Sequence, residues 1–371
     1  MGESLTPLRV GMVGVGAISG QYFDTVARIA SEVQLIAVAD RDDERATAVA
    51  AERGIVARTV DDLFAAPDID LILNLTVPGA HAEVAQRAID HGKHSYGEKP
   101  LALTTAQARP LMAAAEAAGV WLGCAPDTVL GSGIQSARHA VDSGLIGTPV
   151  AATATFVSPG HEAWHPNPDF YYVDGGGPLL DMGPYYLHAL VHLLGPVVSV
   201  FGASSRSRDS RTIASGPRAG ETIPVSIDTH VTAVLEHASG ALSTLITSFD
   251  ATATHAAPIE VHGTAGTLAV PDPNMFDGTS SLRCPGDAAW QPLPIVAGFE
   301  AGGRGIGLLD FARTPAGAVP RADASLALHA LEVMEATLES ARTGRRLDIS
   351  PGATRPRPVP LEQLSVAPPA P

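Results

Sequence analysis

The sequence has few cysteines and no long apolar run. Its two cysteines, Cys124 and Cys284, lie far apart, so neither a disulfide framework nor a paired-cysteine zinc site is indicated. No apolar stretch reaches the 18 or so residues that a membrane-spanning helix needs. The N-terminal stretch "MGESLTPLRVG" lacks the basic and apolar regions of a signal peptide. We therefore expect a cytoplasmic protein that does not bind a membrane.

Basic clusters are also missing. The net charge is −15, with 24 lysines and arginines against 39 acidic residues, which argues against nucleic acid or an anionic membrane as a partner. An anionic ligand must then be held by backbone dipoles and a few placed cations. The length of 371 residues and the hydrophobic content of 45% are typical of a globular protein with two domains.

Short apolar runs alternate with amphipathic, alanine-rich segments in residues 1–127. Continuous apolar strands separated by helices indicate an α/β fold with a doubly wound parallel sheet. The strands are predicted at 8–14, 33–40, 70–76, 93–97 and 120–126, and the helices at 17–30, 43–54, 81–92 and 104–119.

The pattern changes in the second half of the chain, predicted as an α+β domain over residues 128–350. Alternating segments at 150–157, 230–237 and 241–249 predict a mostly antiparallel sheet with one solvated or partner-covered face. A loop rich in glycine and proline covers residues 158–178, and a helix is expected to end at Gly344. Residues 351–371 are proline-rich and are expected to form an extended or disordered tail.

A glycine turn after the first strand predicts a dinucleotide site. Gly14 permits a tight turn, Gly16 lets a pyrophosphate approach the backbone, and Ala17 and Ile18 lead into a helix N-terminus that attracts anions. A simple strand-to-helix turn is the alternative. Asp40, however, ends the second strand 26 residues after Gly14, where a carboxylate can accept from ribose hydroxyls. Asp40 favours NAD, and the neighbouring Arg41 keeps NADP as an alternative.

Lysine is almost absent: Lys93 and Lys99 are the only two, beside 22 arginines. Lys99 follows the fifth strand, and ligands of such sheets bind beyond the carboxyl ends of the strands. An ammonium can hydrogen-bond one alcohol or carbonyl oxygen, whereas a guanidinium suits paired anions. We therefore predict Lys99 at a reacting oxygen, with a solvated surface lysine as the alternative. Lys93, after a helix-ending glycine, is expected to be such a solvated lysine.

A stripe of polar residues marks a later helix, where Asp181, Tyr185, His188 and His192 fall at i, i+4, i+7 and i+11. A phenol near a cationic lysine is a credible general acid/base for an alcohol proton, and Asp181 could accept from a neighbouring substrate hydroxyl. A half-buried core tyrosine is the alternative for Tyr185. The two histidines lack a convincing third ligand, so we predict no metal and treat them as core or substrate-facing residues.

In these motifs the chain resembles the Gfo/Idh/MocA family, named for glucose–fructose oxidoreductase and inositol dehydrogenase. The resemblance covers about residues 8–347 and is carried by "GVGAIS", "NLTVPGAHAEVAQRAIDHGKH" with "EKPLA", "GGGPLLDMGPYY" and "GTAGTLAVPDPN". It implies a Rossmann domain and an α/β domain whose large open sheet often packs against another subunit. Many members carry a histidine where this chain has Tyr185; glucose–fructose oxidoreductase itself has tyrosine there.

Further site residues follow from the resemblance. Thr76, Pro78, His81 and Glu98 match positions near the family's cofactor site, together with Lys99. Asp127 in "APDTVLG" is a candidate on the substrate side. Trp164 and His165 in "HEAWHPNPDFYY" could cover the substrate, because aromatic faces stack well on sugar rings; ordinary loop packing is the alternative.

The predicted function is hydride transfer between NAD or NADP and a carbon bearing a hydroxyl or keto group in a sugar, sugar derivative or cyclic polyol. A homodimer or homotetramer through the C-terminal sheet is expected. Two alternatives remain open. A tightly held NAD could oxidise a glycoside transiently so that it is cleaved, or the protein could sense nicotinamide or sugar without turnover.

Overall fold

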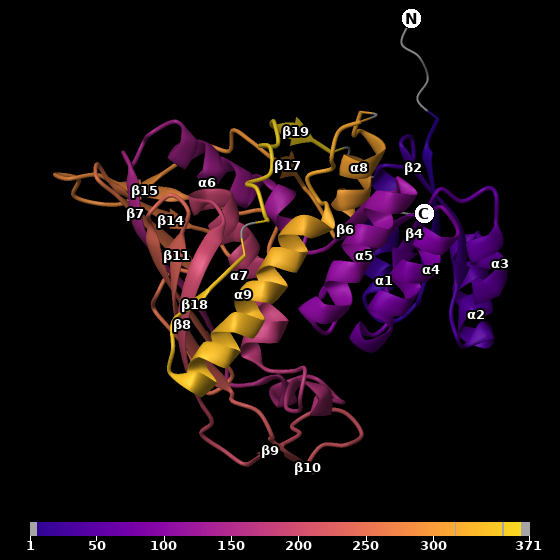
Figure 1. Cartoon of the computed structure of the whole chain (residues 1–371), viewed down its shortest axis with the longest axis horizontal. Coiled ribbons are helices and arrows are strands. Elements are labelled where there is room, and N and C mark those ends of the chain that lie inside the picture. The colour runs from indigo at the N-terminus through magenta and orange to yellow at the C-terminus, as the bar shows by residue number, and fades with distance from the viewer. Residues whose placement is uncertain (1–5, 316, 351, 365–371) are drawn as a thin grey trace, which may run out of the picture. The chain divides into compact units, whose positions relative to one another are not determined.

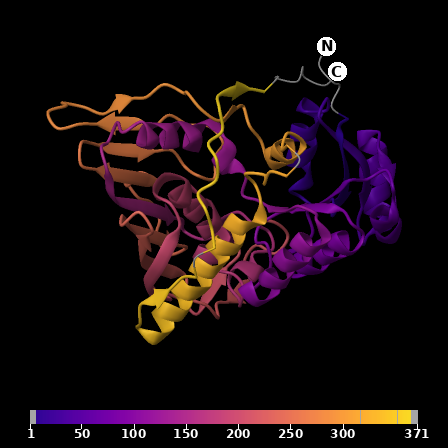
Figure 2. The same cartoon turned by 45° about the horizontal axis from the view of Figure 1, so that its top comes forward.

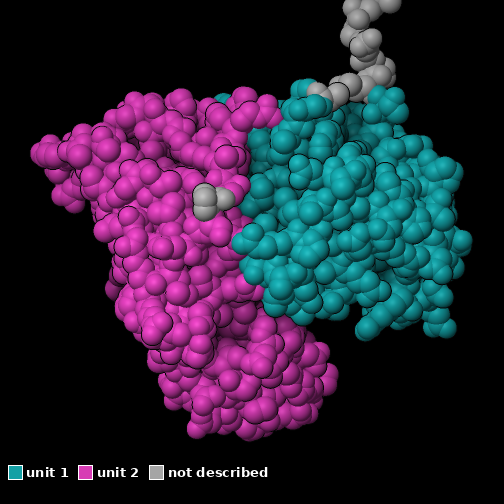
Figure 3. All heavy atoms as spheres, viewed as in Figure 1, with its two compact units in different colours: residues 1–131, 299–328, 361–371 teal, residues 132–298, 329–360 magenta. Residues whose placement is uncertain are grey.

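The computed structural model describes residues 6–315, 317–350 and 352–364. It divides into two compact units, coloured in Figure 3. Unit 1 contains the described parts of 1–131, 299–328 and 361–371, and unit 2 contains those of 132–298 and 329–360. The units are therefore not successive stretches of chain, unlike the predicted domains 1–127 and 128–350.

The reason for this difference is a set of long-range backbone contacts within unit 1. Gly123 forms an antiparallel bridge with Asp323, and the Cys124 N–H donates to the Ala322 carbonyl over 3.2 Å. Phe299–Glu300 (β17) pairs with Glu362–Gln363 (β19). The first two contacts join residues 322–323 to the N-terminal sheet, and the third joins the two late segments to each other.

Unit 1 is built on a six-stranded sheet in which all neighbouring strands run parallel. The order β3-β2-β1-β4-β5-β6 confirms the predicted doubly wound topology, with the direction of winding reversing between β1 and β4. The strands are β1 (Leu8–Val13), β2 (Val33–Ala39), β3 (Val56–Ala57), β4 (Leu71–Asn74), β5 (His94–Gly97) and β6 (Leu122–Cys124). The helices are α1 (Ser19–Arg28), α2 (Asp43–Arg53), α3 (Val60–Ala65), η1 (Pro78–Ala80), α4 (His81–Asp90), α5 (Thr105–Ala118), η2 (Thr128–Leu130) and α8 (Ile306–Ala312).

Local sequence explains where these helices begin and end. The Asp42 and Thr104 side chains cap α2 and α5 by accepting from backbone N–H groups. Gly54 and Gly119 end the same helices in the left-handed conformation, each with φ of +67°, which glycine adopts at little cost.

Unit 2 contains a nine-stranded sheet, visible in Figure 1 with its helices on one face. All neighbouring pairs are antiparallel except β7 with β12, so the predicted mostly antiparallel sheet is confirmed. In spatial order the strands are β16 (Gln291–Pro292), β15 (Ser281–Arg283), β14 (Thr267–Val270), β13 (Ile259–Gly263), β7 (Pro149–Val157), β12 (Leu242–Ser248), β11 (His230–His237), β8 (Val197–Ser205) and β18 (Leu347–Asp348). A separate hairpin consists of β9 (Ser210–Thr212) and β10 (Thr222–Pro224).

One face of this sheet is covered by helices and the other is open. α7 (Pro178–Leu194) contacts β7, β11 and β12, and α6 (Ser132–Asp142) contacts α7 and β14. α9 (Ala324–Thr343) packs on β8, where the Gly202 N–H donates to Ser340 Oγ over 2.9 Å. On the opposite face Phe201 and Val234 are direct cross-strand partners, 48% and 43% exposed. The short 3₁₀ helices η3 (His161–Ala163) and η4 (Asp169–Tyr171) lie in the loop before α7.

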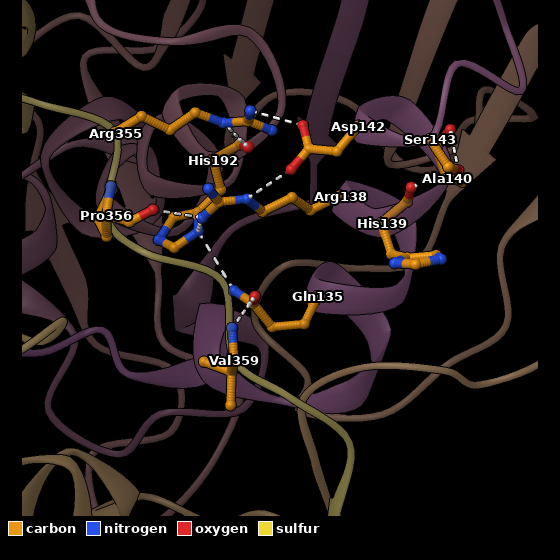
Figure 4. A network of polar contacts seen from close by, with 10 residues as sticks. All are labelled: Gln135, Arg138, His139, Ala140, Asp142, Ser143, His192, Arg355, Pro356 and Val359. Atoms are coloured by element: carbon orange, nitrogen blue, oxygen red, sulfur yellow. Dashed lines mark hydrogen bonds and ion pairs between the residues drawn. The ribbon is translucent and has the colours of Figure 1, made fainter.

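The C-terminal segment is extended, as expected, but it is not disordered over residues 352–364. Figure 2 shows it in yellow, running up to the arrow of β19. Figure 4 shows how residues 355–359 are fastened to α6 and α7. Arg138 donates to the Pro356 carbonyl over 2.6 Å, and the Val359 N–H donates to Gln135 Oε1 over 2.9 Å. Residue 351 and residues 365–371 of the predicted tail lie outside the described residues.

No helix among the described residues is long and apolar enough to cross a membrane.

Candidate active site

The turn between β1 and α1 forms an open cradle. Gly14 has φ of +93°, and a Cβ there would lie 2.6 Å from the backbone oxygen of Leu75, so glycine is required where the two central strands meet. At Gly16, by contrast, a Cβ would meet nothing within 4 Å. Ala17 is exposed, and Ile18, the N-cap of α1, offers no side-chain acceptor. The turn therefore fits a pyrophosphate held at a helix N-terminus.

Asp40 follows β2 and is almost fully buried beside this turn. Its carboxylate accepts from the Val15 N–H over 2.9 Å, the Asp42 N–H over 3.1 Å and Arg45 over 2.6 Å. Burial raises the pKa of Asp40, but the hydrogen bonds, led by that of Arg45, outweigh it and hold the pKa below its usual value. An ionised carboxylate with about four acceptor sites can still take a ribose hydroxyl. The exposed Arg41 and Arg45 lie on the same loop and helix start.

The backbone around Lys99 is held from both sides. Glu98 accepts from the Tyr22 hydroxyl over 2.8 Å and from the Lys99 N–H over 3.0 Å. His81, at the start of α4, has its two ring nitrogens 2.6 Å from the Pro100 carbonyl oxygen and 3.0 Å from that of Thr76. Lys99 itself is half-buried just beyond β5. The contacts of Glu98 and His81 thus fix the position of Lys99, while direct cofactor contact by either residue stays a prediction.

Asn74 at the end of β4 organises the neighbouring loop. Its Oδ1 accepts from the Thr76 hydroxyl over 2.6 Å, and its Nδ2 donates to the His81 carbonyl over 3.1 Å. Pro78 then opens η1. The sequence analysis did not select Asn74 or Tyr22. An asparagine at the end of an apolar strand is nevertheless a recognisable signal of a residue at the ligand-binding edge of the sheet. Asn74 also lines a small cavity together with residues that include His81, Gly97, Glu98 and Cys124.

Two expectations in unit 1 change in the structure. Lys93 is 7% exposed, and its ammonium donates to the Ala66 and Ile69 carbonyls over 2.6 and 2.8 Å, so it is not a solvated lysine. Asp127, expected on the substrate side, is 1% exposed and accepts from the Gly305 and Gly307 N–H groups over 2.8 and 3.0 Å. It caps the start of α8. Its hydrogen-bond partner Gly305 lies 178 residues later in the chain, so no local sequence pattern indicates this role.

The predicted stripe in unit 2 lies on α7. Asp181 is in the first helical turn, and its Oδ2 is 2.7 Å from His161 Nε2. Tyr185 is buried one turn later. His188 donates from Nδ1 to the Pro184 carbonyl over 2.7 Å, and His192 Nδ1 lies within hydrogen-bond distance of Gln135 and Arg138 (Figure 4). Both histidines have the contacts of core residues, one of the two roles that the sequence left open.

The loop before α7 carries the predicted aromatic cover. Trp164 is 60% exposed, and its ring centroid lies 5.4 Å from that of His165. Phe170, which is also exposed, extends the group at 5.5 Å from His165. The exposed rings of Trp164 and Phe170 suit stacking on a flat apolar face of a ligand. No group of three or more metal-ligating side chains occurs among residues 6–315, 317–350 and 352–364.

Buried histidines in unit 2 predict acid sensitivity. Burial lowers the pKa of His188 and of His329 to about 4. The native state keeps both rings neutral, whereas the unfolded chain binds protons below about pH 6.5, so the free energy of unfolding falls from pH 6.5 to 4. We expect His329→Gln to reduce that slope by about 1.4 kcal/mol per pH unit, measured from urea midpoints by circular dichroism. His139→Gln, on an exposed histidine, should leave the slope unchanged; equal slopes in all three proteins would contradict the prediction.

Comparison with known proteins places this geometry in a family. Residues 8–125 match the model described as the oxidoreductase family with an NAD-binding Rossmann fold, and residues 134–269 match the GFO/IDH/MocA C-terminal domain. The chain is 30% identical to a 1,5-anhydro-D-fructose reductase from Ensifer adhaerens, over 70% of this chain and 74% of that protein. It is 28% identical to a D-apiose dehydrogenase from Paraburkholderia graminis, over 91% and 88%. The crystal structure of an NAD-binding oxidoreductase from Klebsiella pneumoniae superposes with a TM-score of 0.80 at 25% identity, over 93% of this chain and 99% of that one.

Proposed function

The chain belongs to the Gfo/Idh/MocA family of NAD-binding oxidoreductases, and we propose that it moves hydride between NAD and a carbinol carbon of a sugar, sugar derivative or cyclic polyol. The observation that carries the proposal lies within unit 1. The glycine cradle with Asp40 and the half-buried Lys99 all occupy the carboxyl-end side of one doubly wound sheet, where such folds bind ligands. The sugar class is supported by relatives named as a sugar-derivative reductase and a sugar dehydrogenase.

The roles of the site residues follow from their chemistry. When bound, NAD supplies the carbon that accepts or returns the hydride. We assign Gly14, Gly16, Ala17 and Ile18 to the pyrophosphate and Asp40 to the ribose hydroxyls, with Arg41, Thr76 and Pro78 nearby. Lys99 donates a hydrogen bond to the reacting oxygen and stabilises its developing negative charge.

In unit 2 we assign the remaining steps to α7 and to the loop before it. The phenolate form of Tyr185 takes the alcohol proton and becomes the phenol, and Asp181 accepts from a neighbouring hydroxyl to orient the ring. Trp164 and His165 stack against the sugar.

The direct test is NAD reduction at 340 nm with a broad panel of sugars, sugar derivatives and cyclic polyols. Reduction with at least one of them is expected. Glycoside cleavage without net reduction, with NAD retained through purification, would instead support transient oxidation. Bound NAD without any turnover across the panel would support a sensing role and contradict the proposal.

Asp40 tests the choice of cofactor. We expect Asp40→Ala to weaken NAD binding by roughly 10- to 100-fold, because hydrogen bonds to a charged group contribute about 1.5–3 kcal/mol. NADP binding should weaken less or improve, since a negative charge is lost beside Arg41 and Arg45. Isothermal titration with both cofactors measures this. Asp43→Ala removes an exposed carboxylate of the first turn of α2 and serves as the control; the same loss in both variants would argue against a ribose contact.

The cytoplasmic location stays a prediction.

The open face of the nine-stranded sheet supports a homo-oligomer. Phe201 and Val234 are exposed side by side, and Leu242 on the next strand is 50% exposed on the same face. Exposed apolar patches of this kind mark interaction surfaces. We expect Val234→Asp to convert the assembly to smaller species in sedimentation experiments. Val319→Asp, at an exposed valine in unit 1, should not; a monomeric wild-type protein would contradict the proposal.

A further inference from the structure

His161 is a buried histidine that the sequence analysis did not select. It is the first residue of η3 and is 7% exposed. Its ring centroid lies 4.2 Å from that of Tyr171, 4.5 Å from that of Phe249 and 5.2 Å from that of Trp164. An imidazole enclosed by three aromatic rings has little contact with water, so its polar partners within the protein decide what it does.

The imidazole of His161 contacts a proposed active-site carboxylate, that of Asp181. His161 Nε2 lies 2.7 Å from Asp181 Oδ2, and the two side chains are 9% and 15% exposed. An ionised carboxylate only accepts hydrogen bonds, so Nε2 carries the proton. His161 Nδ1 is buried without a hydrogen-bond partner in the part of the chain that the structure describes. Of the two ring nitrogens, Nε2 therefore makes a hydrogen bond within the described structure, and Asp181 accepts it.

The backbone of His161 is fixed from the other side. Its N–H donates to the Tyr172 hydroxyl over 3.0 Å, and that hydroxyl donates to Glu162. Arg211 binds the second oxygen of Glu162 over 2.8 Å and also pairs with Asp250. Tyr172 further packs in a small core with Phe249 and the β9–β10 hairpin. The loop is anchored at this point.

The backbone of Asp181 is also fixed, by the helix to which it belongs. α7 begins after Gly177, which has φ of +99°, with Pro178 at its first position. The Asp181 N–H donates to the Gly177 carbonyl over 3.1 Å. With both backbones held, the His161–Asp181 hydrogen bond restrains the orientation of the carboxylate through its Oδ2 atom. Charge-assisted bonds of this kind are short and about twice as strong as neutral ones.

We propose that His161 is a positioning residue: its Nε2–H fixes the carboxylate of Asp181 in the orientation that accepts a substrate hydroxyl. This rests on the proposed function for the role of Asp181 in catalysis. The hydrogen bond itself does not depend on it. A purely structural histidine would affect stability, whereas a positioning histidine affects turnover with cofactor binding unchanged.

Three variants separate these roles. His161→Phe keeps an aromatic ring in the cluster and removes the donor, and we expect kcat to fall about 10- to 100-fold with the NAD affinity of wild type. His161→Gln restores an N–H donor and should recover part of that loss. Phe249→Leu loosens the same cluster without touching the hydrogen bond, so its melting temperature should fall while kcat stays within about threefold. Equal losses of kcat in Phe249→Leu and His161→Phe would assign the effect to packing and overturn the proposal.

A measurement without turnover tests the hydrogen bond alone. In ¹⁵N-labelled full-length protein, the Nε2–H of His161 should give a downfield imidazole signal, assigned by its loss in His161→Gln. The signal should shift or disappear in Asp181→Asn. If it is unchanged there, the proposed pair is wrong. If wild type turns over no member of the panel while the signal responds to Asp181→Asn, the proposed function fails and the pair stands.

Discussion

Lys99→Met is expected to lower kcat by about 10²- to 10⁴-fold while NAD binds within about threefold of wild type. The ammonium is proposed to stabilise charge on the reacting oxygen, and removal of such a group typically has an effect of this size. Lys99→Arg should not restore activity, because a planar guanidinium cannot place a single compact donor at one oxygen. Single-turnover NAD reduction and titration of NAD binding measure the two quantities separately.

The other lysine provides a matched control. Lys93→Met removes the donor to the Ala66 and Ile69 carbonyls, so we expect lower stability with kcat of the folded protein preserved. Lys99→Met should show the reverse. A fully active Lys99→Met enzyme, or equal kcat losses in both variants, would contradict the role given to Lys99.

Tyr185→Phe extends this test to α7. Phenylalanine keeps the buried ring and removes only the hydroxyl, so a loss in kcat of about 10²-fold is expected from the missing acid/base group. Activity near the wild-type level would leave Tyr185 as a core tyrosine, the alternative raised by the sequence.

The largest effect on stability is expected at Arg211. Its side chain is 1% exposed and binds Glu162 and Asp250, which are themselves 9% and 14% exposed. Arg211→Met leaves two buried carboxylates without their cation, a change that typically costs about 3–5 kcal/mol. We expect a marked decrease in the urea midpoint, followed by circular dichroism, together with early cleavage of the loop at 158–178 by protease.

Arg218 offers the comparison within the same part of unit 2. It also contacts two carboxylates, Asp169 over 2.6 Å and Glu221 over 2.9 Å, but it lies at the surface. Solvent and side-chain entropy offset such exposed pairs, so Arg218→Met should keep a urea midpoint close to that of wild type. Similar midpoints for the two variants would show that burial of the Arg211 network does not stabilise the loop.

Local features were predictable from the sequence because their causes lie within a few residues. The apolar runs defined all five predicted strands of the first sheet, and Gly54 and Gly344 end their helices as expected. The glycine turn, Asp40 and the helical spacing of Asp181 and Tyr185 were readable for the same reason. Strand–helix alternation predicted a parallel, doubly wound sheet, and the structure supplied the order of its strands.

Tertiary structure alone decided the features whose partners lie far along the chain. Asp127 caps a helix 178 residues later, the buried Lys93 ammonium donates to the Ala66 and Ile69 carbonyls, and residues 299–328 return to the first unit. The role proposed for His161 could be inferred only from the folded structure, in which its Nε2 lies 2.7 Å from Asp181 Oδ2. The sequence by itself determined five strands of the first sheet and helices between them, the glycine turn and the chemical types of the candidate site residues. Which polar groups are buried, and which partners satisfy them, depends on long-range packing, because desolvation is a property of the folded surroundings and not of the neighbouring residues.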